Sequence, residues 1–233
     1  MGKYLTLLLV ALFFSMDVGK AQSPVRYQTI EIPPVNETAA VPGLADFIKR
    51  LVIACDKKDT AYVLRVVDEE VAVSYGGGLY GKAAFLEEFL RQGGGFTTLK
   101  EVLLLGGTHE QDEEYPGKAV YVFPYVQAGK LYKGKTDTLE IDPFLTAVGL
   151  ERHLVVFKKP SLTAPQVGVL RYPLLKLDPD TNLLHSKWAQ VATFDHKIKG
   201  YVLWEKLYHL AGTTLRLVNM EEGYRIVSVA PFD

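Results

Sequence analysis

Cysteine is almost absent from this chain of 233 residues, in which Cys55 is the only one. A single thiol cannot form an intramolecular disulfide, which excludes the small disulfide-stapled class of secreted domain. An excess of one charge is also missing, because 26 Lys and Arg stand against 27 Asp and Glu. That balance argues against nucleic acid as the main partner, since nucleic-acid-binding domains carry a marked basic excess.

Long apolar runs are scarce as well. Leu5–Phe14 is the longest, and its ten residues are half of the about 20 that a membrane-spanning helix needs. The run follows Lys3 and precedes Gly19-Lys20-Ala21, which has small residues at positions −3 and −1 of a cleavage site. We therefore predict a signal peptide over residues 1–21, cleaved after Ala21, and a periplasmic or secreted mature protein without a membrane span. A buried N-terminal helix is the alternative.

Motifs for catalysis and metal binding are missing too. No two histidines lie at the i, i+3 or i+4 spacing of metal ligands, and neither a Gly-x-Ser-x-Gly elbow nor Ser-x-x-Lys occurs. The five histidines are His109, His153, His185, His196 and His209. The acidic stretch after His109 lacks the alternating oxygens of a calcium loop and is predicted to be a solvated turn. The sequence thus predicts no catalytic residue, no metal and no cofactor.

One glycine-rich stretch has part of the sequence pattern of a phosphate-binding loop. Gly76–Ala83 follows an expected strand, precedes an expected helix and contains Gly-x₄-Gly-Lys, ending in Lys82. A phosphate-binding loop needs a Ser or Thr hydroxyl on Mg²⁺ after the lysine, and Ala83 has none. We therefore interpret the stretch as a packing turn with a solvated Lys82.

Apolar periodicity in the first half predicts helices and short strands. The i, i+3, i+4 spacing from Leu44 to Cys55 predicts a helix whose apolar stripe includes Cys55, so its thiol is expected to be buried and structural. Residues 62–67 and 85–90 predict two further helices, and Val71, Val73 and Tyr75 alternate as a strand. Residues 99–105 are apolar but ambiguous. Ala119–Val126 predicts a buried strand with Pro124 at an edge or bulge.

This order of helices, Val-x-Val strand, glycine turn and helix resembles the opening of nuclear-transport-factor-like α+β domains. The C-terminal hairpin, Leu215–Val218 and Tyr224–Val229 around Glu221-Glu222-Gly223, resembles their final strands. The resemblance implies an α+β domain completed by the C-terminus. Alternatively, the N-terminal part is a separate helical domain, and the hairpin extends the following domain.

Short β-rich segments separated by Pro, Asp and Gly follow one another from Leu154 to Leu203, as a small barrel requires. These segments are Leu154–Phe157, Gln166–Leu170, Leu174–Leu177, Lys187–Val191 and Gly200–Leu203. Their order resembles the bacterial SH3-like domain, with Pro160-Ser161 after the first strand and a closing Gly200-Tyr201-Val202. Two departures are Val155-Val156-Phe157, where relatives carry Asn-Val-Arg, and Tyr201 in place of Trp. A ligand contact that depends on the Arg of the family is not expected here.

The predicted fold is therefore α+β, with a helix-rich N-terminal domain, a small SH3-like β-barrel and a C-terminal β-hairpin. The predicted parts are a signal peptide (1–21), an extended lead-in (22–42), the α+β domain (43–146), the barrel (147–208) and the hairpin (209–233), which packs on either domain. The oligomeric state is left open.

Aromatic residues of the barrel supply the candidate binding site: Tyr172, Trp188 and Tyr201. Trp188 is expected to be mainly core, whereas Tyr172 and Tyr201 flank turns and can project from strand ends. Residues 147–208 carry nine Lys and Arg against five Asp and Glu, which suits an anionic wall polymer. The predicted function is an exported, non-catalytic binding protein of the bacterial cell envelope that contacts peptidoglycan, an envelope protein or a peptide.

Two other functions stay open. One is a structural scaffold whose aromatic residues pack between its own domains. The other is an enzyme with a pocket in the N-terminal domain near Tyr75, Lys82 and Tyr125.

Overall fold

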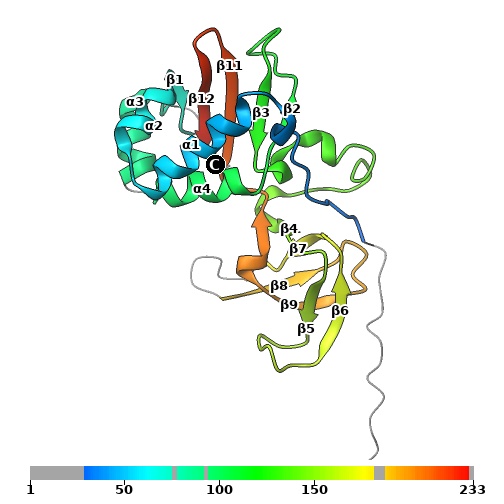
Figure 1. Ribbon diagram of the computed structural model, residues 1–233. Helices are drawn as coiled ribbons and strands as arrows, with labels where there is room; N and C mark the ends of the chain where they lie inside the picture. The colour runs from blue at the N-terminus through cyan, green and yellow to red at the C-terminus, as the bar shows by residue number, and fades with distance from the viewer. Residues whose placement is uncertain (1–28, 75–77, 92–93, 181–186, 231–233) are drawn as a thin grey trace, which may run out of the picture.

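The computed structural model describes residues 29–74, 78–91, 94–180 and 187–230. They form two units that stack along the long axis of the molecule, each built around its own sheet (Figure 1). The α-helices belong to the first unit, and the second is built from strands and short turns. The predicted mixed α+β class is confirmed. The predicted signal peptide, residues 1–21, lies outside the described residues.

The first unit contains a five-stranded sheet in the order β1-β12-β11-β3-β2. Its strands are β1 (Val67–Ala72), β2 (Thr108–Glu110), β3 (Val120–Phe123), β11 (Thr214–Met220) and β12 (Gly223–Ala230). All neighbours are antiparallel except β1 and β12, which run parallel. The predicted strand at Ala119–Val126 ends at Phe123, and Pro124 begins the short turn that follows. Proline suits this position because it has no N–H to donate to a ladder.

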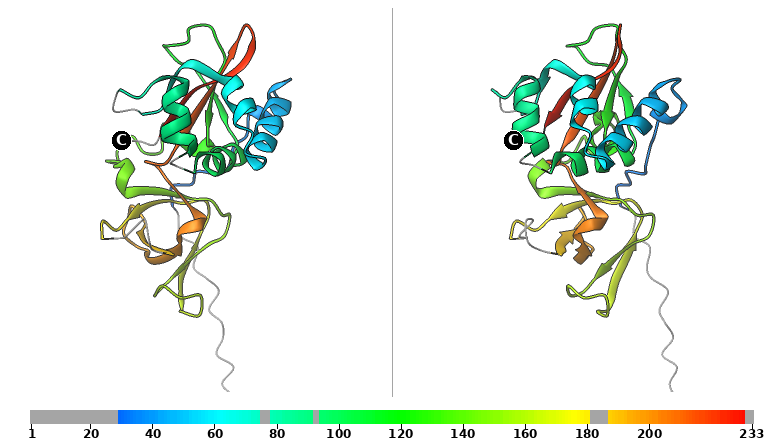
Figure 2. Two further views of the ribbon diagram at one scale, coloured as in Figure 1. Left: turned by 90° about the vertical axis from the view of Figure 1, so that its left-hand side faces the viewer. Right: turned by 60° about the vertical axis from the view of Figure 1, so that its left-hand side comes forward.

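Helices cover one face of this sheet, as the two views of Figure 2 show. They are α1 (Leu44–Asp56), α2 (Thr60–Val66), α3 (Gly81–Ala84), the π-helix η2 (Phe85–Arg91) and α4 (Gly95–Leu104). The apolar stripe of α1 is buried as its spacing predicts, and Asp59 caps α2 by accepting from the Tyr62 N–H at 2.9 Å. Residues 99–104 of the ambiguous stretch belong to α4, which begins after Gly94 in the left-handed conformation, and Leu105 is its C-cap. Helices and strands thus enclose one large apolar core.

The C-terminal hairpin completes the first sheet. β11 pairs with β3 and with β12, and β12 pairs with β1, so the hairpin lies in the middle of a sheet whose other strands precede residue 124. Figure 1 shows these last strands beside the first-unit helices. The second unit is therefore an insertion between β3 and β11, and the hairpin does not extend its sheet.

The second unit holds a seven-stranded sheet in the order β10-β4-β7-β8-β9-β5-β6. Its strands are β4 (Thr146–Gly149), β5 (Leu154–Phe157), β6 (Gln166–Leu170), β7 (Leu174–Leu177), β8 (Trp188–Ala192), β9 (Lys199–Leu203) and β10 (Leu207–His209). A short 3-10 turn, η6 (Trp204–Lys206), joins β9 to β10. Within the described ranges the strand order is linear, with β10 and β6 at the edges, so this sheet is not a closed barrel there.

The sequence misplaced the opening strand of this sheet. Leu154–Phe157 was expected to come first, but it is β5, one arm of a hairpin with β6. The chain enters the sheet earlier, at β4, which pairs with β7 and with the last strand, β10. All four residues of β4 are buried, so it shows no alternation of apolar and polar residues that would mark a strand.

The lead-in connects the two units. At residues 30–32 the Ile32 N–H donates to the Tyr172 carbonyl and the Leu174 N–H donates to the Ile30 carbonyl, both at 2.8 Å. A short 3-10 turn, η1 (Thr38–Ala40), follows. A small apolar cluster buries the contact between the units, and its members are Ile32, Tyr125, Val126, Val148 and Leu174. Both units therefore share buried surface.

Candidate functional site

One face of the second sheet carries two of the three side chains for which the sequence predicts a role in binding, Trp188 and Tyr201. The other face packs its apolar residues into the core of the unit. Because side chains alternate along a strand, every second residue of β7, β8 and β9 points away from that core. We call the face formed by these residues the outer face.

Strand pairing places the outer-face residues in rows across the sheet. The first row contains Thr146, Lys176, Ala192 and Lys199, which are paired in sequence from β4 to β9. The second row contains Asp178, Gln190, Tyr201 and Phe157, the last three paired across β8, β9 and β5. Side chains directly opposite on neighbouring strands lie in contact distance, so each row forms a continuous surface.

Hydrogen bonds fix the second row. The Gln190 amide nitrogen donates to the Asp178 carboxylate at 2.9 Å, and the Tyr201 hydroxyl donates to the Gln190 amide oxygen at 3.0 Å. Lys199 Nζ lies 3.6 Å from the same Asp178 carboxylate. The Gln190 amide is thus held in one orientation between an acceptor and a donor. Such a network presents a preorganised polar surface to a ligand.

Trp188 continues this surface and is not the core residue that the sequence predicted. It is only partly buried, and its ring lies edge-on to the Phe157 ring with centroids 5.7 Å apart. The neighbouring Ala189 and Val191 fill the core instead. Trp188 and Tyr201, two of the three predicted binding residues, are therefore brought together on the outer face.

We expect Trp188→Ala to lower the free energy of unfolding by about 1–2 kcal/mol, less than the about 3–5 kcal/mol of a buried ring. A double-mutant cycle with Phe157→Ala in urea denaturation should give a coupling of about 0.5–1.5 kcal/mol between the two rings. If Trp188→Ala alone lowers the free energy of unfolding by more than about 3 kcal/mol, Trp188 is a core residue after all.

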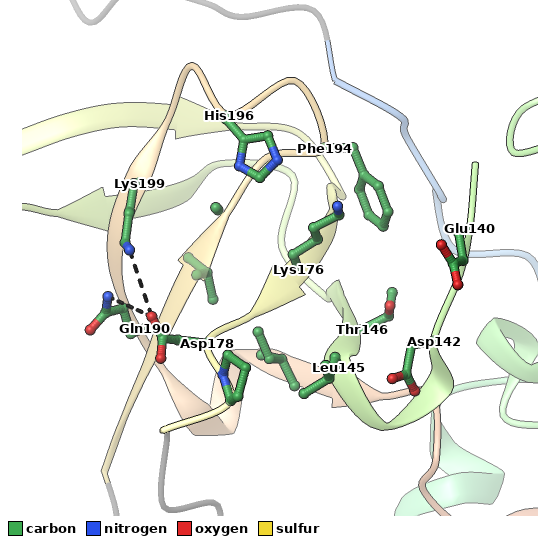
Figure 3. Close-up of a pocket in the computed structure, with 14 residues that line it drawn as sticks. Glu140, Asp142, Leu145, Thr146, Lys176, Asp178, Gln190, Phe194, His196 and Lys199 are labelled. Atoms are coloured by element: carbon green, nitrogen blue, oxygen red, sulfur yellow. Dashed lines mark hydrogen bonds and ion pairs between the residues drawn. The ribbon is translucent and has the colours of Figure 1, made fainter. Parts of the chain in front are cut away.

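A groove lies at the first row, where residues 124–145, which form the connector from β3 to β4, overhang the sheet (Figure 3). Its volume is about 460 Å³, within the range of about 300–1,000 Å³ that is usual for ligand sites. The first-row residues form its floor. One wall comes from the connector at Glu140, Asp142 and Leu145, and the other from Phe194 and His196 in the β8–β9 turn. A second hollow of about 370 Å³ adjoins it at Phe194, the one residue common to both linings.

The groove contains charges of both signs. Lys176 extends over the Phe194 ring, with Nζ 5.1 Å from the ring centroid, a cation–π contact. Asp178 is already engaged by Lys199 and Gln190. Glu140 and Asp142 stand on the opposite wall. The arrangement suits a ligand that carries charge and apolar surface together.

Tyr172, the third predicted binding residue, lies elsewhere. It occupies the turn between β6 and β7 with φ 41°, its N–H donates to the Glu151 carbonyl at 3.0 Å, and its carbonyl accepts from Ile32. Its phenol lies close enough to Tyr125 to raise the pKa of Tyr125 further, after the larger effect of burial. Tyr172 thus belongs to the junction between the units and is not part of the outer face.

The residues of the enzyme alternative do not converge. Lys82 on α3 pairs with Glu69 on β1 at the surface, 2.5 Å apart, whereas Tyr125 is buried in the junction cluster. Tyr75 lies outside the described residues. The space between the first sheet and its helices is filled by apolar side chains, among them the rings of Phe47, Phe85, Phe89, Tyr121 and Phe123.

Cys55 is buried in the first core, as its place on the apolar stripe predicts. Burial, with a smaller contribution from Asp56, raises the pKa of its thiol from 9.0 to about 11. At pH 8 the native protein should react with a thiol reagent roughly 100-fold more slowly than the urea-unfolded chain, because the raised pKa of the thiol leaves about 100-fold less thiolate. The absorbance of the released reporter group measures the reaction rate. Equal rates in the native and unfolded states would place Cys55 at the surface.

No three His, Cys, Asp or Glu side chains gather in a metal-binding arrangement among the residues that the structure describes, and His185 lies outside them. The acidic stretch after His109 is less solvated than expected. The Asp112 carboxylate accepts from the Glu114 N–H at 2.9 Å and lies 3.2 Å from the Arg216 guanidinium, and its side chain is only 12 % exposed.

Sequence reasoning missed most of the groove. Two of its residues had a signal in the sequence, namely the alternation of polar and apolar residues in a strand with one outward face. Lys176 stands between Leu175 and Leu177, and Gln190 stands between Ala189 and Val191. No such pattern in the sequence marks Glu140, Asp142 or Phe194, because they reach the groove only through folding of the connector and the β8–β9 turn.

Comparison with models of known families, with curated proteins and with solved structures finds no match for this chain. Across the described parts of the chain, none of the helices combines the length and hydropathy that crossing a membrane requires.

Proposed function

We propose that this chain is an exported, non-catalytic binding protein of the bacterial cell envelope, and that the outer face of its second sheet binds peptidoglycan or a peptide. Export rests on the signal-like pattern of residues 1–21. Binding rests on one observation above all: the groove lies beside a row of partly exposed rings and a fixed amide on the same face. Ligand sites commonly combine apolar walls with a few oriented polar groups.

We also propose that the second unit is an SH3-like domain, whose seven-stranded sheet is open between its edge strands β10 and β6 within the described residues. Support comes from the course of the chain: β4, the long hairpin β5–β6, the antiparallel run β7-β8-β9, the 3-10 turn η6, and the return of β10 to β4. The first unit is proposed to be a nuclear-transport-factor-like domain, supported by its helices on one sheet face and by the last hairpin beside β1.

Sedimentation with purified cell-wall sacculi tests the binding function. Ala192→Leu adds bulk to the groove floor without changing charge, and Tyr201→Ala removes a ring from the adjoining row. We expect each change to weaken sedimentation about tenfold, the loss that follows from about 1.4 kcal/mol of binding energy.

Ala83→Leu provides the matched control, since the same substitution falls on an exposed position of α3 in the other unit. It should sediment like the unmodified protein. Folding of all variants is checked by circular dichroism. Unchanged sedimentation of folded Ala192→Leu and Tyr201→Ala proteins would reject the outer face as the binding site.

A scaffold without a ligand is the second candidate, and the junction favours it. Tyr125 is buried between the units with Val148 and Leu174, and Tyr172 lies beside it. Aromatic residues there hold the two units together. If unmodified protein fails to sediment with sacculi, the scaffold becomes the better proposal.

A further inference from the structure

Among the residues that the structure describes, three charged side chains of the groove have no partner of opposite sign: Lys176, Glu140 and Asp142. Among the described residues, Lys176 Nζ makes its contact with the Phe194 ring and has no carboxylate within 4.0 Å. The carboxylates of Glu140 and Asp142 have no cation within that distance in the same part of the chain. Lys199, the other lysine of the floor, lies 3.6 Å from Asp178. Lys176, Glu140 and Asp142 are thus the charges of the groove that a ligand can still neutralise.

These charges come from different walls. Lys176 rises from the floor on β7 toward Phe194, whereas Glu140 lies on the connector beside Asp142 (Figure 3). One Asp142 oxygen accepts from the Phe144 N–H at 2.9 Å, which leaves its other oxygen for a ligand. The groove therefore offers a cation on one side and one or two carboxylates on the other.

We propose that the groove binds a short wall peptide through both of its charged ends, with the free C-terminal carboxylate at Lys176 and a free side-chain ammonium at Glu140 and Asp142. This inference rests on the binding function proposed above and names its ligand class. Wall peptides that are not cross-linked carry both groups on one short chain, whereas a neutral glycan carries neither. Charge-assisted hydrogen bonds at both ends would set orientation and exclude peptides blocked at either end.

Calorimetric titration of the chain from Gln22 to Asp233 tests the inference with defined probes. The parent probe is Nα-acetyl-Lys-D-Ala-D-Ala, and two blocked forms carry either a C-terminal amide or an acetylated side-chain amine. We expect each block to weaken binding about tenfold. Lys176→Gln should abolish the preference for the free carboxylate alone, and Glu140→Gln should abolish the preference for the free amine alone.

Lys187→Gln and Glu205→Gln are matched controls, because both residues are exposed and line neither hollow. Both should keep the two preferences. Absence of binding by the parent probe, or preferences that survive in the Lys176→Gln and Glu140→Gln proteins, would overturn the inference. Tighter binding of a fourth probe, Nα-acetyl-Lys-Ala-Ala with both alanines in the L configuration, would also overturn it, since a protein C-terminus would then be the better ligand.

The two proposals fail separately. The protein can sediment with sacculi, and lose this in Ala192→Leu, while the probe does not bind. In that case the outer face still binds the wall, but through another chemical group. If neither the sacculi nor the probe binds, both proposals fall together with the outer face as a site.

Discussion

Tyr125→Ala should lower the free energy of unfolding by about 3–5 kcal/mol and separate the unfolding of the two units. The Tyr125 ring is 1 % exposed and packs against Ile32 from the lead-in and Val148 and Leu174 from the second sheet. Its hydroxyl faces the Ile32 carbonyl at 3.4 Å. Removing the ring leaves a cavity at the place where both units bury surface together, so their stabilities become independent.

The chain provides a separate probe for each unit. Both tryptophans, Trp188 and Trp204, belong to the second unit, so their fluorescence reports that unit, whereas far-ultraviolet circular dichroism is dominated by the helices of the first. In urea the two signals should change together in the unmodified protein and at different urea concentrations in Tyr125→Ala.

Tyr125→Phe is the matched control, because it keeps the ring and removes only a long hydrogen bond. It should cost at most about 1 kcal/mol and keep the two signals together. Coincident transitions in Tyr125→Ala, with a loss below about 1 kcal/mol, would show that the junction does not couple the units.

Gly200→Ala should destabilise the second unit by about 3 kcal/mol, the upper end for an overpacked site. A Cβ atom at Gly200 would lie 2.4 Å from the Phe157 carbonyl oxygen and 2.8 Å from Val156 Cγ1. A backbone oxygen cannot turn aside as a side chain does, so β5 must separate from β9. The β5–β6 hairpin is joined to the rest of the sheet through that pairing.

Tryptophan fluorescence in urea measures the loss, and hydrogen exchange should locate it in β5 and β6. Gly129→Ala is the matched control, since a Cβ there meets nothing within 4 Å and its φ is not positive. It should change stability by less than about 0.5 kcal/mol. If the two alanine variants are equally stable, the close approach at Gly200 does not constrain the sheet.

The Gly200 contact explains one local signal in the sequence. The Gly-aromatic-Val pattern contributed to the resemblance with SH3-like domains. Here the glycine lies where the Phe157 carbonyl of the paired strand β5 comes close to β9, while Tyr201 turns outward. The pattern thus combines a close approach on the inner face with an exposed ring on the outer one. Whether the domain family is the one it resembles stays a prediction.

Local patterns determined the elements that have a regular period. The stripe from Leu44 to Cys55 predicted α1 and the buried thiol, and alternation along 188–191 predicted β8. The predicted inward direction of the Trp188 side chain was wrong, because a strand pattern specifies which residues share a face but not which face meets the core. Ala189 and Val191 are small enough to fill that core, so the larger ring points outward.

Only the tertiary structure decided where the second sheet begins, which sheet the C-terminal hairpin joins, and where the groove lies. β4 is buried on both faces and has no period to detect, and β11 finds β3 across the whole inserted unit. Glu140 and Lys176 are far apart in sequence and share a groove because the connector folds back over the sheet. Periodicity depends on neighbours along the chain, whereas a site depends on which distant segments pack together. This sequence by itself therefore determined the regular elements but not the site.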